Sequence, residues 1–196
     1  MSKLWFKFGA MNCGKTTRLM QEAHNYEERG MKVFVIKSAI DLKADDCISS
    51  RIGLNRKVDL LIQKDESIIG HLPDELLDKI SCIFVDEAQF LSEEQVDELF
   101  YIARYKNIPV MCYGLKNDFR TKLFEGSQRL LELTDPDTQE FLKTICSCGT
   151  LARFNARKIN GEFVNEGEQV AIDGIDAEYE SLCPNCYDKL VLKRKR

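Results

Sequence analysis

Eight residues near the N-terminus have the types and spacing of a phosphate-binding loop. They are Gly9-Ala10-Met11-Asn12-Cys13-Gly14-Lys15-Thr16, which match the pattern G-x-x-x-x-G-K-[ST]. In such a loop the glycines let backbone N–H groups turn toward phosphate oxygens, the lysine neutralises phosphate charge and the hydroxyl coordinates Mg²⁺. We therefore expect Lys15 to contact phosphates and Thr16 to bind magnesium.

Two carboxylates follow an apolar segment farther along the chain. Residues 82–85 read Cys-Ile-Phe-Val and lead directly into Asp86 and Glu87. An aspartate at the carboxyl end of a buried strand is the expected second magnesium-side residue of a phosphate-loop protein. Glu87 has the position of a general base, and the residues alone leave open whether it acts on water or on an alcohol.

Four of the eight cysteines form two close pairs, Cys146-Ser147-Cys148 and Cys183-Pro184-Asn185-Cys186. Four thiolates suit a closed tetrahedral Zn²⁺ site, and free thiols or a redox pair are the alternative. The stretch between the pairs is longer than a compact zinc-ribbon loop, so we expect it to have another task, such as covering a ligand. Cys82 and Cys112 lie in apolar runs and are expected in the core.

The elements that would position these residues alternate between strand and helix. An alternating pattern, in which Leu4, Phe6 and Phe8 are separated by Trp5 and Lys7, predicts a strand that ends at Gly9. Continuous apolar runs at 33–36, 82–85 and 110–113 predict strands buried on both faces, as in a parallel sheet.

Two helices are readable between these strands. One is expected over 15–29 with Gly30 as its left-handed stop, and the other begins after Ser92, where Gln95 completes a capping box. The alternation predicts a parallel α/β sheet with right-handed crossovers. We interpret residues 40–56 as a polar, mobile loop or an excursion from the sheet, and residues after about Lys143 as a second, smaller unit.

The bulk composition excludes several classes of protein. The chain has 196 residues and a formal net charge of -4, which argues against a nucleic-acid binder. No apolar run approaches the ~20 residues of a membrane span, and no signal peptide is evident. We therefore expect a cytoplasmic protein without membrane or nucleic-acid partners, in which disulfides are rare.

Four ordered segments resemble the cytosolic-type (type II) thymidine kinase family: residues 8–17, 84–91, 112–119 and 167–179. The resemblance implies a RecA-like phosphate-loop domain over 1–143 and a zinc-binding domain over 144–196, whose lasso loop covers the nucleoside. It also implies transfer of the γ-phosphate of ATP to the 5′-hydroxyl of thymidine, and of deoxyuridine, with Glu87 as proton acceptor. A homotetramer and feedback binding of thymidine triphosphate are further implications.

The resemblance assigns residues to each ligand. For ATP these are Gly9, Ala10, Met11, Asn12, Cys13, Gly14, Lys15, Thr16, Asp86 and Gln89, with Thr16 and Asp86 also on Mg²⁺. For the nucleoside they are Met11, Asp41, Phe90, Leu115, Phe119, Phe124, Val170, Ile172, Asp173, Gly174 and Tyr179. For zinc they are Cys146, Cys148, Cys183 and Cys186.

Two positions depart from the family pattern. Lys43 stands where the family leads us to expect an arginine, and the first cysteine pair is C-x-C where many relatives have C-x-x-C. Without the resemblance, Phe90, Phe119 and Phe124 are interpreted as core residues. Two other functions compete with the kinase: an ATPase that acts on nucleic acid, and a non-enzymatic zinc module with a structural nucleotide.

Overall fold

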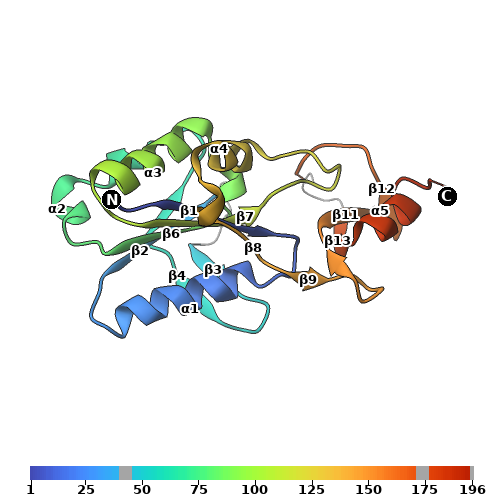
Figure 1. Cartoon of the computed structure of the whole chain (residues 1–196), viewed down its shortest axis with the longest axis horizontal. Helices are drawn as coiled ribbons and strands as arrows, with labels where there is room; N and C mark the ends of the chain where they lie inside the picture. The colour runs from blue at the N-terminus through green and yellow to red at the C-terminus, as the bar shows by residue number, and fades with distance from the viewer. Residues whose placement is uncertain (40–45, 171–176, 195–196) are drawn as a thin grey trace.

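A parallel sheet forms the larger part of the molecule (Figure 1). The computed structural model describes residues 1–39, 46–170 and 177–194. The strands of this sheet are β1 (Leu4–Gly9), β2 (Val33–Ser38), β5 (Leu60–Ile62), β6 (Cys82–Asp86), β7 (Val110–Leu115) and β8 (Gln139–Phe141). Their order is β5-β2-β6-β7-β1-β8, and every neighbouring pair is parallel. The predicted parallel α/β sheet is confirmed, whereas the edge strands β5 and β8 are too short to show a period in the sequence.

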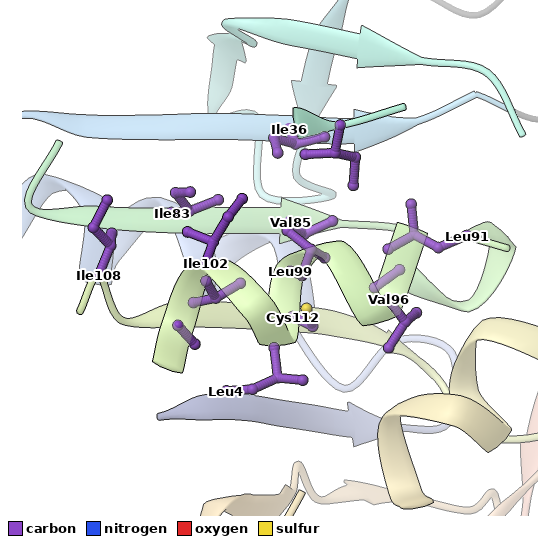
Figure 2. Packing of buried hydrophobic residues seen from close by; sticks show 14 of the residues in the cluster. Leu4, Ile36, Ile83, Val85, Leu91, Val96, Leu99, Ile102, Ile108 and Cys112 are labelled. Atoms are coloured by element: carbon purple, nitrogen blue, oxygen red, sulfur yellow. The ribbon is translucent and has the colours of Figure 1, made fainter. Parts of the chain in front are cut away.

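Helices cover both faces of the sheet (Figure 1). Helix α1 (Lys15–Glu27) lies on one face, and α3 (Glu93–Tyr105) and α4 (Glu125–Leu133) lie on the other. Side chains alternate along β6. Ile83 and Val85 pack on the α3 side (Figure 2), and Cys82 and Phe84 pack on the α1 side. Because both faces are covered, every residue of β6 is buried, as its continuous apolar run predicts.

The predicted helix ends are close to the observed ones. Helix α1 ends two residues before the predicted Arg29, and Gly30 follows with φ 74° while its N–H donates to the carbonyl of Glu27 at 2.9 Å. The capping box of α3 is confirmed. Ser92 Oγ accepts from the backbone N–H of Gln95 at 3.2 Å, and the Gln95 side chain accepts from the N–H of Ser92 at 3.1 Å.

The interpretation of residues 40–56 as a loop is wrong for part of that stretch. Strands β3 (Cys47–Ser49) and β4 (Asn55–Lys57) pair as an antiparallel hairpin. Each strand has three residues and is mostly polar, and burial of Ile48 in the α1-side core is what fixes the hairpin on the molecule. The remaining short helices before the last strand of the sheet are α2 (Asp74–Leu77) and the 3₁₀ helices η1 (Ile69–His71), η2 (Ala88–Phe90) and η3 (Pro136–Thr138).

Beyond β8 the strand pairs are antiparallel. The elements are β9 (Thr144–Ile145), β10 (Leu151–Ala152), β11 (Phe154–Ile159), β12 (Glu162–Val164), β13 (Ala177–Leu182) and α5 (Pro184–Leu190). They share a small core of their own, which includes Ala156, Leu182 and Tyr187. The division of the chain at residue 143 stays a prediction. Among the described residues, no helix has the length and apolarity to cross a membrane.

Candidate active site

The phosphate loop joins β1 to α1 at the carboxyl edge of the sheet. Gly14 precedes the helix with φ 80°, a left-handed conformation that favours glycine, and Asn12 has φ 65°. Lys15 Nζ donates to the carbonyl of Ala10 at 3.3 Å and lies 3.8 Å from Cys13 Sγ. The lysine therefore lies back over its own loop, where the helix N-terminus and the loop amides favour an anion.

The carboxylates at the end of β6 lie next to this loop. Asp86 is 3% exposed and accepts the Thr16 hydroxyl at 3.1 Å. Burial and then the charge of Glu87 raise the pKa of Asp86 to about 7. A nearby cation stabilises the charged form of a buried carboxylate whose pKa is raised. Asp86 and Thr16 supply the oxygen ligands that Mg²⁺ prefers. The pair therefore fits the predicted magnesium site.

Glu87 is held in an uncommon backbone conformation with φ 54°. Its side chain accepts a hydrogen bond from Gln89 Nε2, and Gln89 Oε1 in turn accepts from the N–H of Leu115 at 3.0 Å. Gln89 therefore fixes the Glu87 carboxylate against β7. The assignment of Gln89 to ATP, which the resemblance implies, stays a prediction; its side chain lies beside Glu87, at the larger of the two cavities described next.

Two cavities meet at Glu87. The smaller, about 310 Å³, lies over the phosphate loop, and the larger, about 490 Å³, lies toward the C-terminal strands. Among the described residues, Met11, Glu87 and Leu115 are the ones that line both. Of the residues predicted for ATP, Met11, Asn12, Gly14, Lys15 and Thr16 line the smaller cavity, while Gly9, Ala10, Cys13 and Asp86 are not among its lining residues.

The larger cavity gathers the described residues that were predicted for the nucleoside. They are Met11, Phe90, Leu115, Phe119, Phe124, Val170 and Tyr179. Phe119 and Phe124 are 1% and 5% exposed, so both side chains are buried as well as lining the cavity, while their contact with a nucleoside stays a prediction. The rings of Phe90 and Phe124 meet edge to face with centroids 5.4 Å apart. Asp41, Lys43, Ile172, Asp173 and Gly174 lie outside the described residues.

Several polar residues of the cavities escape sequence reasoning. Asn155 lines the larger cavity, accepts from the N–H of Met11 at 2.7 Å and donates to the carbonyl of Asn117 at 3.1 Å. Arg51 lines the smaller cavity from the turn of the β3–β4 hairpin. No motif surrounds either residue, and only the fold brings them to the site. The other polar ones are Lys37, Ser38, Asn117, Asp118 and Gln169 in the larger cavity, and Thr17, Ser49 and Ser50 in the smaller one.

The four paired cysteines converge. The Sγ atoms of Cys146, Cys148, Cys183 and Cys186 all lie within 4.8 Å of one another. Tetrahedral Zn–S bonds of about 2.3 Å place sulfur atoms about 3.8 Å apart, so the cluster fits zinc. Hydrogen bonds that the Cys186 thiol donates to Cys148 and to the other two sulfurs raise the pKa of Cys186 to about 12. The C-x-C pair joins the cluster as well as the C-x-x-C pair does.

A glycine-rich loop between strand and helix, next to an acidic strand end, defines the class as an α/β nucleotide-binding protein. A family model described as thymidine kinase matches residues 2–187. The chain therefore belongs to the thymidine kinase family.

Individual relatives agree over almost the whole chain. A thymidine kinase of Enterobacteria phage T4 is 43% identical over 98% of this chain and 99% of its own. A thymidine kinase of Mannheimia succiniciproducens is 44% identical over 93% of both chains, and one of Mesorhizobium japonicum is 46% identical over 93% of this chain and 89% of its own.

Proposed function

We propose that this protein is an ATP-dependent thymidine kinase that transfers the γ-phosphate of ATP to the 5′-hydroxyl of thymidine, and of deoxyuridine. The observation that carries the proposal is the position of Glu87, which lines both the phosphate-loop cavity and the larger, mostly apolar cavity. A carboxylate between a donor site and an acceptor site is placed to take the proton of the attacking hydroxyl. The product is thymidine monophosphate, a precursor for DNA synthesis.

The ATP phosphates bind in the smaller cavity in this proposal. Residues 9–16 enclose them, Lys15 neutralises their charge, and Thr16 and Asp86 hold Mg²⁺, which supplies charge stabilisation during transfer. The protein then has little covalent chemistry to perform, because positioning and electrostatics account for most of phosphoryl-transfer catalysis. Transfer is direct, without a phosphorylated enzyme.

The nucleoside binds in the larger cavity with its 5′-oxygen toward Glu87. Phe90, Phe119 and Phe124 supply flat apolar surface for a base and sugar, while Asn155 and Gln169 supply hydrogen-bonding groups.

The cysteine cluster binds one structural Zn²⁺ and supports the strands that carry Asn155 and Tyr179. In this proposal thymidine triphosphate acts as a feedback ligand and the enzyme is a homotetramer. We also propose a cytoplasmic location, since free thiols persist there.

The test is a transfer assay with γ-labelled ATP, Mg²⁺ and a panel of nucleosides, with DNA in a parallel reaction. We expect label on thymidine and deoxyuridine and far less on cytidine or adenosine. Release of free phosphate that is stimulated by DNA, without any labelled nucleoside, refutes the kinase in favour of an ATPase. A Lys15→Ala variant that keeps the full biological activity instead supports a non-enzymatic module.

A further inference from the structure

Arg157 is a charged side chain buried behind the larger cavity. It is 3% exposed and lies in the middle of β11, where it pairs with Tyr179 of β13. Among the described residues it takes part in no salt bridge, although charged side chains are rarely buried without a partner. Within the described part of the chain, neutral groups compensate the guanidinium.

The contacts of this guanidinium come from three separate segments. Nε donates to the Tyr179 hydroxyl at 2.9 Å, and the two terminal nitrogens donate to the carbonyls of Glu168 at 2.8 Å and Gln169 at 2.9 Å. Its central carbon lies 3.8 Å from the centroid of the Phe119 ring. All three nitrogens and one face of the planar group are thus engaged.

These partners form a wall of the larger cavity. Phe119, Gln169 and Tyr179 line it, whereas Arg157 does not. They belong to the loop after β7, the segment after β12 and strand β13, and Arg157 is the side chain that contacts all three. We infer that Arg157 is a positioning residue that holds this wall in place and thereby sets the affinity for the nucleoside, without touching it. The inference rests on the proposed function.

The geometry requires arginine. The planar guanidinium of arginine donates to two consecutive carbonyls and a hydroxyl while it stacks on an aromatic ring. The ammonium group of lysine cannot make this set of contacts. Arg157→Lys keeps the positive charge and most of the aliphatic side chain, so it removes the guanidinium contacts with the least disturbance of the packing. Lys158→Gln is the matched control, because Lys158 is the next residue in the same strand and does not line the cavity. Its side chain forms an ion pair with Glu180 and lies over the ring of Phe163.

The experiment measures thymidine binding by calorimetry without ATP, and then the KM of each substrate. For Arg157→Lys we expect a Kd and KM for thymidine raised about 10- to 100-fold, since hydrogen bonds from a charged donor are lost. The KM for ATP should change less than about twofold and kcat less than about tenfold, because the phosphate loop is untouched. Lys158→Gln should resemble wild type in every parameter.

Two results overturn the inference. One is an unchanged thymidine KM in folded Arg157→Lys protein, and the other is an equal loss of thymidine and ATP binding, which indicates general loosening. If Arg157→Lys does not fold, Arg157→Gln is measured in its place, because it removes the guanidinium together with the buried charge. Unchanged thymidine binding in that variant then overturns the inference, and a weakening of about tenfold or more with ATP binding kept supports it. Wild-type protein that phosphorylates no nucleoside refutes the proposed function instead.

Discussion

At the scale of single residues, Glu87 combines two features that a general base needs. Its backbone has φ 54°, which turns the side chain out of the strand direction, and Gln89 donates to its carboxylate. Gln89 is itself buried and bonded to β7, so the carboxylate has a fixed orientation. Its neighbour Asp86 is more deeply buried and faces Thr16, so the two adjacent carboxylates have different tasks.

Replacement of Glu87 tests the proton-acceptor role. Glu87→Gln keeps the size of the side chain but cannot take a proton, so kcat should fall by about 10²- to 10⁴-fold with thymidine binding largely kept. Single-turnover transfer from labelled ATP and thymidine calorimetry measure the two effects. Glu94→Gln, on the exposed first turn of α3, is the control. Normal turnover of Glu87→Gln contradicts the assignment.

Arg51 gives a second test at this scale. It lines the phosphate-loop cavity from the β3–β4 hairpin and makes no hydrogen bond or ion pair with any described residue. A cation there is available to phosphate oxygens, so Arg51→Gln should raise the KM for ATP about tenfold and leave that for thymidine unchanged. Lys57→Gln removes a charge from the same hairpin without touching the cavity. Equal kinetics in both variants contradict a phosphate role.

At the scale of elements, β1 and α1 are joined by a buried ion pair beneath the phosphate loop. Lys7 of β1 is 6% exposed and donates to both oxygens of Glu22 at 2.7 Å. Glu22 also accepts from Arg18 at 2.6 Å and from the Tyr113 hydroxyl at 2.9 Å. The pair therefore connects the strand before the loop to the helix after it, and its loss should loosen that connection.

Stability should depend on the charge of Glu22. Burial raises its pKa, but the hydrogen bonds from Lys7, Arg18 and Tyr113 outweigh burial, and the net pKa lies below the ordinary 4.5. A depressed pKa stabilises the fold above the unfolded pKa, and this contribution is lost as pH falls through the folded pKa. Wild type should therefore lose stability below about pH 4.5 through this group.

Urea denaturation at pH 7 and pH 4 measures the effect. At pH 7, Glu22→Gln should lower the free energy of unfolding by about 3 kcal/mol, because Lys7 is left buried with weaker compensation. The loss between pH 7 and pH 4 should be smaller in Glu22→Gln than in wild type. Glu28→Gln, an exposed residue just after the same helix, should follow wild type. Parallel pH profiles for wild type and Glu22→Gln contradict the assignment.

Elements with strong local signals are predictable from the sequence. The Ser92–Gln95 capping box and the apolar run of β6 appear where expected, because capping bonds and burial on both faces act on residues close in sequence. The β3–β4 hairpin is not predictable in this way. Its polar strands carry no period, and its position depends on the burial of Ile48 against the distant α1-side core.

At the scale of the whole molecule, the C-terminal strands complete the site from a distance. The N–H of Met11 donates to Asn155, its carbonyl accepts from Ser181, and the Tyr187 hydroxyl donates to the carbonyl of Phe119. The phosphate loop and the larger cavity therefore depend on the part of the chain that holds the cysteine cluster. That part has only a small core, for which a metal is an effective support.

Removal of zinc should therefore affect the two substrates differently. Purified protein should contain one Zn²⁺ per chain by atomic absorption, and 1,10-phenanthroline or Cys183→Ser should remove it. Thymidine binding should weaken by more than tenfold and ATP binding by less, because Met11 bonds to the C-terminal strands whereas Lys15 and Thr16 bond to Ala10 and Asp86. Cys47→Ser, outside the cluster, should keep both zinc and affinity. Metal-free protein with normal thymidine affinity contradicts this dependence.

The sequence by itself determined the chemistry that acts over short distances. The phosphate loop, Asp86 with Glu87, the cysteine pairs and the parallel sheet all follow from local spacing or local burial. Only the tertiary structure decided that Glu87 lines two cavities and that Asn155 and Arg51 line one each. It also decided that Arg157 contacts the residues that form a wall of the larger cavity. These positions depend on contacts between residues far apart along the chain, and no short-range pattern encodes which distant side chains the packed strands bring together.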